Sequence, residues 1–410
     1  MVASGADAPP LPRSAPSHRP LAPLPDRPSE APNTGRGGGA DVGHGEVTPE
    51  EWSRLAATVL ARSLGLRRGQ SVIIETWSHA TPAAEAFAVE ARRLGVRPLV
   101  LYEGERGFFE SHEKARPQDA AAIGAAEFAA LAAADGYVYL PGPEDLDRWR
   151  ALPEKNRHAL DQWIEQWSRA VQRHSVRVAY LHIASATGPA ARTHGVDLAR
   201  WKREAYDASL VDPRAFRRDA RSLIDRLAKG RRVTLTHPNG THLDLGLAGY
   251  RPILQDGTVR ERDLREGRNW AILPAGYVAV SLNDRQGDGV VVGNRPSRHR
   301  RGSLTGARWT FRDGRLVEYA FEHGREIFEA SYLTASKERD RPAFLEIGLN
   351  PKVHEAPFLQ DQELGVVTVY IGRNDDWGGR TRGTFRDYVL IEGADLCVDD
   401  RPVVRAGKLV

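Results

Sequence analysis

Histidine is the residue type here that could most directly do acid–base or metal chemistry, and the chain has thirteen histidines. They are scattered, and no two lie at the close spacing of a metal-binding motif. His79 in "TWSHATP", His182 in "YLHIAS" and His354 in "KVHEAP" are the most notable. A single histidine at the end of a strand is more often a hydrogen-bonded structural residue than a catalyst. The histidines by themselves therefore define no site.

A dense basic run, "RPSRHRR" from Arg295 to Arg301, is the second chemically notable segment. Such a run could contact phosphates or nucleic acid. No RNP-like aromatics, zinc-finger spacing or recognition-helix pattern accompanies it. We interpret it as an exposed loop between strands and expect no nucleic-acid partner.

Several common catalytic motifs are absent from the sequence. There is no H-E-x-x-H, no Walker loop, no G-x-G-x-x-G after a strand and no G-x-S-x-G elbow. The sequence therefore does not favour a zincin, a nucleotide-driven enzyme or an α/β-hydrolase.

The composition is that of an ordinary globular protein, with 41% hydrophobic and 27% charged residues in 410. No apolar run approaches the roughly 18–20 residues that span a bilayer. The single cysteine, Cys397, cannot form an internal disulfide. We expect a cytoplasmic protein with no membrane partner.

The pattern of residues predicts three parts. Residues 1–45, rich in Pro, Ala and Gly, are expected to be a disordered tail. Residues 46–230 are expected to form an α/β domain, which begins with a helix capped by Thr48 and Glu51. Its parallel strands are predicted at 71–75, 97–102, 136–140 and 176–183, alternating with helices.

Residues 231–410 are predicted to form a mostly antiparallel β-rich domain. Hairpins are expected at Asn239-Gly240 and at Asp313-Gly314, because both pairs suit tight turns. The stretch "ILPAGYVAV", residues 272–280, is expected to be a Pro-Ala-Gly turn that leads into a strand.

Six phrases in order resemble the aminopeptidase T family of metallo-aminopeptidases. They are "HPNGTHLDLGLAGYRP", "LPAGYVAV", "RWTFRDGRLVEY", "FLEIGLNPKV", "LQDQELGVVTVYIG" and "DDWGGRTRGTFRDYVLI". The α/β half also fits from "QSVIIETWSHATP" onward. The resemblance implies an aminopeptidase T-like fold, an α/β domain with a parallel sheet plus an antiparallel β domain, and a homodimer.

In that family two glutamates, two histidines and an aspartate hold two metal ions, whose bound water attacks an N-terminal peptide bond. Carried over position by position, the glutamates fall on Tyr277 and Phe344, and one histidine falls on Thr368. The closing H-x-D pair falls on Arg386 and Tyr388. All five positions hold non-ligands or poor ligands, so we predict no metal pair and no other cofactor.

A rebuilt metal site would need other residues. Glu346 shares a strand face with Phe344, because side chains two apart point to the same side. Asp387 lies between the two positions of the former H-x-D pair and is expected to point away. A single ion held by Glu346 and His354 is the one metal site left open.

The replaced side chains suggest a hydrogen-bonding pocket with one fixed positive charge. Tyr277 or Tyr388 would be the acid–base group, since a tyrosine beside a cation can have a depressed pKa. Arg386 would anchor a carboxylate or phosphate, and Thr368, Phe344 and Glu346 would line the ligand site. The alternative is that these side chains only fill a cavity that binds no ligand, with Arg386 paired to Glu346.

Three functions are compatible with this pattern. The first is a metal-independent enzyme acting on an amino-acid-like or small carboxylate compound. The second is a non-catalytic protein that binds a small-molecule or peptide-like ligand. The third is a metallo-aminopeptidase whose ligands have moved. A branch that resembles this fold cleaves dihydroxypyridine rings with iron and an H-x-D pair, which this chain lacks.

Overall fold

The computed structural model describes residues 46–300, 302–335, 337–383 and 385–410. The predicted disordered tail lies outside these residues. The described residues all lie in one compact unit. The predicted boundary near residue 230 therefore stays a prediction.

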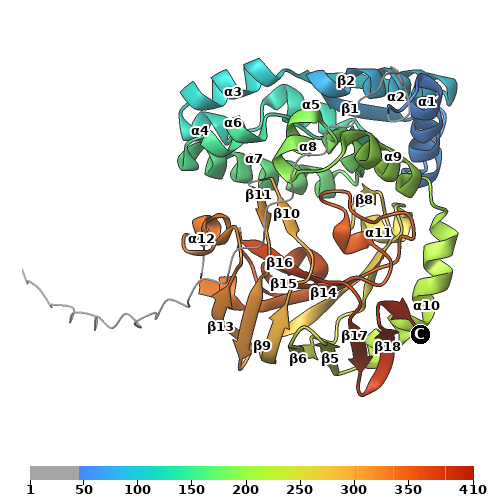
Figure 1. Cartoon of the computed structure of the whole chain (residues 1–410). Helices are drawn as coiled ribbons and strands as arrows, with labels where there is room; N and C mark the ends of the chain where they lie inside the picture. Colours follow the sequence, from blue (N-terminus) through green and yellow to red (C-terminus); the bar gives the residue numbers. More distant parts are fainter. Residues whose placement is uncertain (1–45, 301, 336, 384) are drawn as a thin grey trace, which may run out of the picture. The chain divides into compact units, whose positions relative to one another are not determined.

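The first half of the described chain forms a parallel sheet, as predicted (Figure 1). Its strands run in the order β2-β1-β3-β4-β8, and every neighbouring pair in that order is parallel. They are β1 (Ser71–Trp77), β2 (Arg97–Glu103), β3 (Gly136–Tyr139), β4 (Arg177–Leu181) and β8 (Trp270–Leu273). The first four match the predicted strands. The fifth comes from the second half of the chain and was not predicted.

The described chain contains twelve α-helices, most of them in its first half, and the first of them begins as predicted. The Thr48 hydroxyl accepts from the Glu51 amide, and the Glu51 carboxylate accepts from the Thr48 amide, which completes a capping box. The helices are α1 (Pro49–Thr58), continued by the π-helix η1 (Val59–Ser63), α2 (Thr81–Arg93), α3 (Glu105–Lys114), α4 (Pro117–Ala120), α5 (Ala125–Ala132), α6 (Leu146–Ala151), α7 (Glu154–Arg173), α8 (Gly188–His194), α9 (Leu198–Ser209), α10 (Pro213–Lys229), α11 (Glu261–Arg265) and α12 (Arg325–Tyr332).

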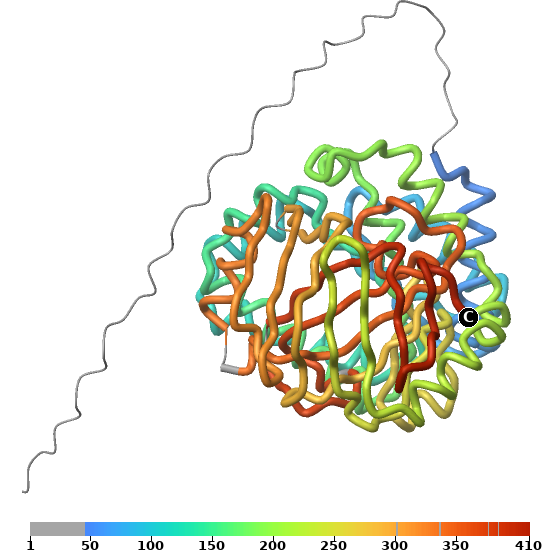
Figure 2. The backbone as a smooth tube through the Cα atoms, turned by 60° about the horizontal axis from the view of Figure 1, so that its bottom comes forward, coloured from blue at the N-terminus to red at the C-terminus, as the bar shows by residue number. Residues whose placement is uncertain are grey.

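The second half contains a large antiparallel sheet, whose long strands lie side by side in Figure 2. Its main order is β16-β15-β14-β9-β6-β5-β17-β18-β19, and β7, β12 and β13 pair at its side. The strands are β5 (Arg232–His237), β6 (Thr241–Leu247), β7 (Ile253–Gln255), β9 (Tyr277–Val292), β12 (Arg308–Arg312), β13 (Arg315–Ala320), β14 (Pro342–Gly348), β15 (Val367–Gly372), β16 (Arg386–Ile391), β17 (Asp395–Val398), β18 (Arg401–Arg405) and β19 (Lys408–Leu409).

Local turn chemistry explains the hairpins of this sheet. Gly240 and Gly314 have positive φ values of 96° and 64°, which suit the tight turns predicted at these positions. The turns join β5 to β6 and β12 to β13. A separate small hairpin pairs β10 (Ser297–His299) with β11 (Gly302–Leu304).

The Pro-Ala-Gly turn links the two sheets. β8 ends the parallel sheet at Leu273, and β9 begins the antiparallel sheet at Tyr277. Gly276 between them has φ +117°, and a Cβ at this position would lie 2.6 Å from the Phe216 ring. Only glycine combines that backbone conformation with the close approach of α10.

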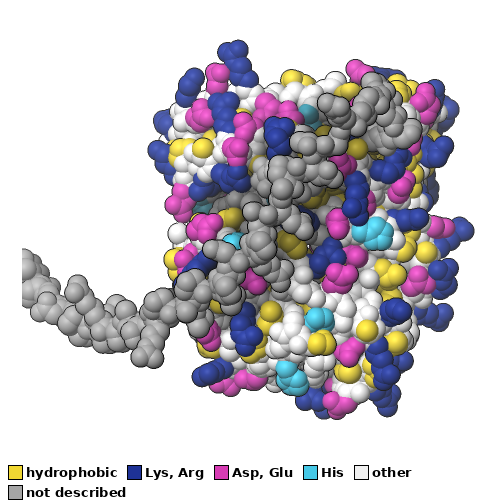
Figure 3. Space-filling view, in the orientation of Figure 1, with side chains coloured by type: hydrophobic (Ala, Val, Ile, Leu, Met, Phe, Trp, Pro, Cys, Tyr) yellow, Lys and Arg dark blue, Asp and Glu magenta, His cyan; other side chains and the backbone are white. Residues whose placement is uncertain are grey.

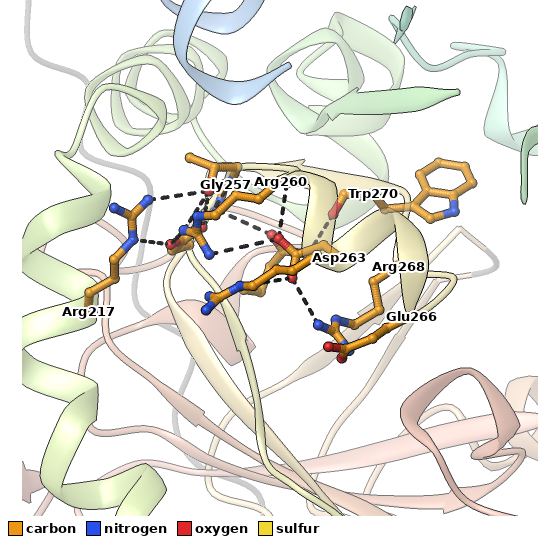
Figure 4. Close-up of polar contacts among 11 residues, drawn as sticks. Arg217, Gly257, Arg260, Asp263, Glu266, Arg268 and Trp270 are labelled. Atoms are coloured by element: carbon orange, nitrogen blue, oxygen red, sulfur yellow. Dashed lines mark hydrogen bonds and ion pairs between the residues drawn. The ribbon is translucent and has the colours of Figure 1, made fainter. Parts of the chain in front are cut away.

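A polar network holds the connection that leads into β8 (Figure 4). The buried Asp256 carboxylate accepts from Arg217 Nε of α10 at 2.6 Å and also from the Arg260 guanidinium. Asp263 accepts from Arg268 at 2.9 Å, and the Trp270 carbonyl accepts from Gln255 at 3.1 Å. The network fixes the chain just before β8, which the Pro-Ala-Gly turn joins to β9.

One hydrophobic core runs through both sheets. Its buried members include Phe87 and Val138 near the parallel sheet, and Leu243 and Val369 of the antiparallel sheet. On the face drawn in Figure 3, basic and acidic side chains are interspersed. Among the described residues, no helix is long and apolar enough to cross a membrane.

Candidate functional site

The residues singled out in the sequence lie on one face of the antiparallel sheet. Opposite residues of paired strands share a face, and side chains alternate along each strand. The register pairs Glu346 with Thr368, and Phe344 stands two residues before Glu346. Tyr277 lies opposite Gly348, Arg386 opposite Gly372, and Tyr388 opposite Tyr370. β9, β14, β15 and β16 thus bring together Tyr277, Phe344, Glu346, Thr368, Arg386 and Tyr388.

Aromatic rings fill the centre of this face. Phe344 stacks on Tyr370 with centroids 4.1 Å apart, and Trp377 lies 5.5 Å from Phe344 and 5.9 Å from Tyr277. Phe344 and Tyr277 are 1% and 3% exposed. Two of the positions where the resemblance places ligands are therefore packed core.

Arg386 lies over this aromatic cluster. Its guanidinium carbon is 5.0 Å from the centroid of the Phe344 ring, a cation–π geometry. Its Nε donates to the carbonyl of Arg373 at 3.1 Å. These contacts place a fixed positive charge on the face, as the sequence suggested.

Two carboxyl groups and one phenol form a buried hydrogen-bonded group beside the cluster. The Tyr370 hydroxyl lies 2.9 Å from Glu346 Oε2 and 3.1 Å from Asp361 Oδ2. Burial raises the pKa of the Glu346 carboxyl well above its usual range, and the nearby Asp361 adds to this. Burial also raises the pKa of Asp361. The pair therefore retains a proton at pH values where exposed carboxyls have lost theirs.

Asp361 and Tyr370 were missed in the sequence. Both stand in the quoted phrase "LQDQELGVVTVYIG". Tyr370 is two residues after Thr368 on the same strand, so the alternation that linked Phe344 to Glu346 could also have placed Tyr370 on this face. Asp361 precedes the strand, and no local pattern marks it.

The other two predicted site residues have distinct surroundings. Thr368 is fully buried, and its hydroxyl has no hydrogen-bond partner among the described residues. The Tyr388 hydroxyl donates to the carbonyl of Arg298 at 2.9 Å, and its ring lies 4.8 Å from that of His299.

The expectation of a depressed pKa is wrong for Tyr388. Burial raises the pKa of this phenol well above its usual range, and the negative charges of Asp361 and Asp387 raise it further. The nearby cations do not offset these effects. Tyr388 is therefore a neutral hydrogen-bonding group at physiological pH.

A pocket of about 320 Å³ adjoins this face. His182 of the 3-10 helix η3 (His182–Ser185) contributes from the end of β4. Tyr388 contributes from β16. The remaining lining residues come from two segments, Arg298, His299 and Arg300 around β10 and Phe358, Gln360 and Asp361 before β15.

The basic run is placed differently from the prediction. Ser297–His299 form β10, and Arg298, His299 and Arg300 are half-buried. The interpretation as an exposed loop is wrong for these three residues, because β10 pairs with β11 and packs near β16. Arg301 lies outside the described residues.

Comparison with known proteins decides the family. A model of the thermophilic metalloprotease (M29) family matches residues 48–334, which is more than half of the chain. The chain belongs to this family. No curated protein matches it.

Two solved structures support the M29 fold. The chain is similar to AmpT from Thermus thermophilus with a TM-score of 0.66 and 19% identity, over 88% of this chain and 99% of that one. It is also similar to 2,5-dihydroxypyridine dioxygenase from Pseudomonas putida KT2440, with a TM-score of 0.61 and 14% identity, over 89% and 98% of the two chains. The resemblance to aminopeptidase T and the predicted fold are confirmed.

The M29 match ends before most of the positions where the resemblance places ligands. It includes Tyr277 but stops at residue 334. Phe344, Thr368, Arg386 and Tyr388 all lie beyond it. The family is thus shown by the part of the chain that precedes β14.

The family name implies a bound metal, and the residues on this face do not fit a metal pair. Phenylalanine offers no ligand atom, Arg386 is a cation, and the Thr368 hydroxyl is a weak ligand. The acidic groups that remain, Glu346 and Asp361, are bound to Tyr370. The described residues contain no group of three or more histidine, cysteine or acidic side chains placed to hold a metal ion.

The single-ion site suggested for Glu346 and His354 receives no support from their contacts. Glu346 is 3% exposed and accepts from Tyr370. The His354 side chain is 59% exposed, and its Nδ1 lies 4.0 Å from Glu363. The two side chains face different partners.

Proposed function

We propose that this M29-family chain acts on a small amino-acid-like or carboxylate compound without the family's metal pair. The stack of Phe344 on Tyr370 carries the proposal, because these rings occupy the face where the family would place its ligands. A metal pair needs several anionic or imidazole ligands that converge on one point. This face offers a cation, two tyrosines and a phenylalanine instead.

The carboxyl pair supplies the acid–base chemistry in this proposal. Asp361 lines the pocket, and the Tyr370 hydroxyl links it to Glu346. A carboxyl group whose pKa is raised by burial can donate its proton to a bound compound and take it back. The hydrogen bond between Glu346 and Asp361 then favours the ionised form of Asp361 after the proton has left. This role replaces the one predicted for Tyr277, whose ring is packed against Trp377.

The test compares metal dependence with dependence on Asp361. Protein dialysed against a chelator would be assayed for metal content and for cleavage of leucine anilide with added Zn²⁺, Co²⁺ or Mn²⁺. We expect substoichiometric metal and no metal-stimulated cleavage. Stoichiometric metal together with metal-dependent cleavage would refute the proposal and indicate an aminopeptidase with displaced ligands.

A second arm separates an enzyme from a binding protein. The metal-free protein would be incubated with a panel of amino-acid amides and small carboxylic acids, and product formation followed by mass spectrometry. We expect turnover that Asp361→Asn abolishes. Binding without turnover across the panel would instead indicate a non-catalytic protein.

A further inference from the structure

The pocket beside the carboxyl pair carries a second, more specific inference. Its lining joins the end of β4, the β10 segment and the loop before β15, so it exists only in the folded chain. The basic run that seemed a surface feature in the sequence forms one of its walls. The chemistry of that wall indicates what the pocket holds.

The two arginines of the wall have only neutral partners. Arg298 Nη1 donates to the Glu355 carbonyl at 2.9 Å, and Arg300 Nη1 donates to the Gly142 carbonyl at 2.9 Å. Arg300 is also hydrogen-bonded to the phenols of Tyr139 and Tyr180. Among the described residues neither arginine has a carboxylate partner. Because a half-buried cation without a paired carboxylate loses part of its hydration, an anion in the pocket would offset that loss.

The other titratable groups of the pocket do not supply this counter-charge. Burial and the Arg300 charge lower the pKa of His182 to about 3, so this imidazole is neutral. Asp361 shares its hydrogen bonds with Glu346 and Tyr370, and burial favours its protonated form. Asp361 is therefore a weaker counter-charge for the two arginines than an exposed carboxylate would be.

Several polar atoms of the lining have no hydrogen-bond partner among the described residues. They include two potential donors, Arg298 Nε and His182 Nδ1, and one acceptor, Gln360 Oε1. Gln360 is 2% exposed, and its amide nitrogen already donates to the Pro296 carbonyl at 2.9 Å. Buried polar atoms normally find partners. These atoms are enclosed in the structure, so a ligand reaches them only after a small shift of the side chains, and one that satisfies the set must then carry acceptors for the arginine side and a donor for the Gln360 oxygen.

Size and shape narrow the ligand further. The pocket volume of about 320 Å³ lies at the lower end of the roughly 300–1,000 Å³ that is typical of small-molecule sites. Phe358 and Tyr388 supply aromatic walls. Phe358 holds a left-handed conformation with φ 66°, which is unusual for a bulky residue. A small ring fits these dimensions and walls.

We propose that this pocket binds a small aromatic carboxylate that also bears a hydroxyl group. Its carboxylate binds Arg298 with support from Arg300, and its hydroxyl donates to Gln360 Oε1. The ring lies between Phe358 and Tyr388. The proposal rests on the proposed function and names the class of compound at that site.

The experiment uses three matched probes and isothermal titration calorimetry on the full-length, chelator-treated protein. The probes are 3-hydroxybenzoate, benzoate and the neutral 3-hydroxybenzyl alcohol. We expect 3-hydroxybenzoate to bind more tightly than benzoate, and the alcohol not to bind measurably. This comparison needs no variant. Equal binding of the alcohol and the acid would overturn the assignment.

Two variants test the residues. Arg298→Gln should weaken 3-hydroxybenzoate binding about tenfold or more, since a hydrogen bond to a charged group contributes about 1.5–3 kcal/mol. Arg312→Gln, which removes an exposed arginine on β12, should bind like the wild type. Unchanged binding by Arg298→Gln, or inorganic phosphate that binds as tightly as 3-hydroxybenzoate, would contradict the proposal.

Failure of the proposed ligand class can be distinguished from failure of the proposed function. Metal-dependent cleavage of leucine anilide would refute metal independence whatever the probes do. Failure of the probes to bind metal-free protein that shows no metal-dependent cleavage would refute only the ligand class.

Discussion

The ring of Phe344 lies nearly parallel to the ring of Tyr370, with centroids 4.1 Å apart and planes inclined by 15°. This pair occupies the sheet face where the family resemblance places metal ligands. Both rings are buried, and the Arg386 guanidinium covers Phe344 from a third strand. Phe344 is thus part of a packed aromatic core, and this has measurable consequences.

Phe344→Ala should destabilise the protein by about 3–5 kcal/mol, because it removes a fully buried ring and leaves a cavity. The free energy of unfolding would be measured by urea denaturation. Phe128→Ala is the matched control, since Phe128 is 38% exposed and should cost far less. Similar losses in the two variants would show that Phe344 is not packed as described.

Glu346→Gln should change how stability depends on pH. Burial raises the pKa of Glu346 above the ordinary 4.5 in the folded protein. The folded state therefore binds the proton more tightly than the unfolded state, and wild-type stability falls as pH rises above about 4.5 through the folded pKa. Glutamine cannot ionise, so the variant should gain stability relative to the wild type between pH 5 and pH 8.

Urea midpoints of both proteins at these two pH values measure this gain. Glu326→Gln, which removes an exposed acid from α12, controls for the loss of one negative charge. Parallel pH profiles for Glu346→Gln and the wild type would mean that Glu346 is not held in its protonated form.

Glu204→Ala should loosen the loop that carries Phe358, Gln360 and Asp361 to the pocket. Glu204 Oε1 on α9 accepts from the backbone amides of residues 354, 355 and 356 at 2.6, 3.1 and 3.0 Å. Loss of this acceptor should cost about 1.5–3 kcal/mol. Hydrogen exchange would report it as faster exchange of these three amides.

The exposed neighbour supplies the control for this variant. The Glu355 side chain is 61% exposed, so Glu355→Ala should leave the exchange of the three amides near that of the wild type. Amides of β1 should be unaffected in both variants. Unchanged protection of residues 354–356 in Glu204→Ala would argue against its anchoring role.

Gly276→Ala should be destabilising by about 1–3 kcal/mol or more, because it combines an unfavourable φ of +117° with a contact of 2.6 Å to Phe216. Gly267→Ala separates the two effects, since Gly267 has φ +73° and open space around its Cβ position. Thermal unfolding of both variants measures the difference. A smaller loss at Gly276 than at Gly267 would contradict the close approach of α10.

Much of the fold could be predicted because its signals are local. Apolar runs marked β1 and β3, and Thr48 with Glu51 marked the start of α1. Asn239-Gly240 and Asp313-Gly314 marked two hairpins. β8 was not predicted, because its place in the parallel sheet depends on its pairing with β4. That strand lies about ninety residues earlier in the chain.

The sequence by itself determined which side chains stand where the family resemblance places ligands, since Tyr277, Phe344, Thr368, Arg386 and Tyr388 are read directly at their positions. Only the tertiary structure decided what those side chains do. In the folded chain Phe344 stacks on Tyr370, and the Tyr370 hydroxyl links Glu346 to Asp361. Arg298 and Arg300 line a pocket, although their run appeared to be a surface loop in the sequence. Pairing, burial and pKa depend on contacts between segments far apart in the chain, and no local pattern encodes them.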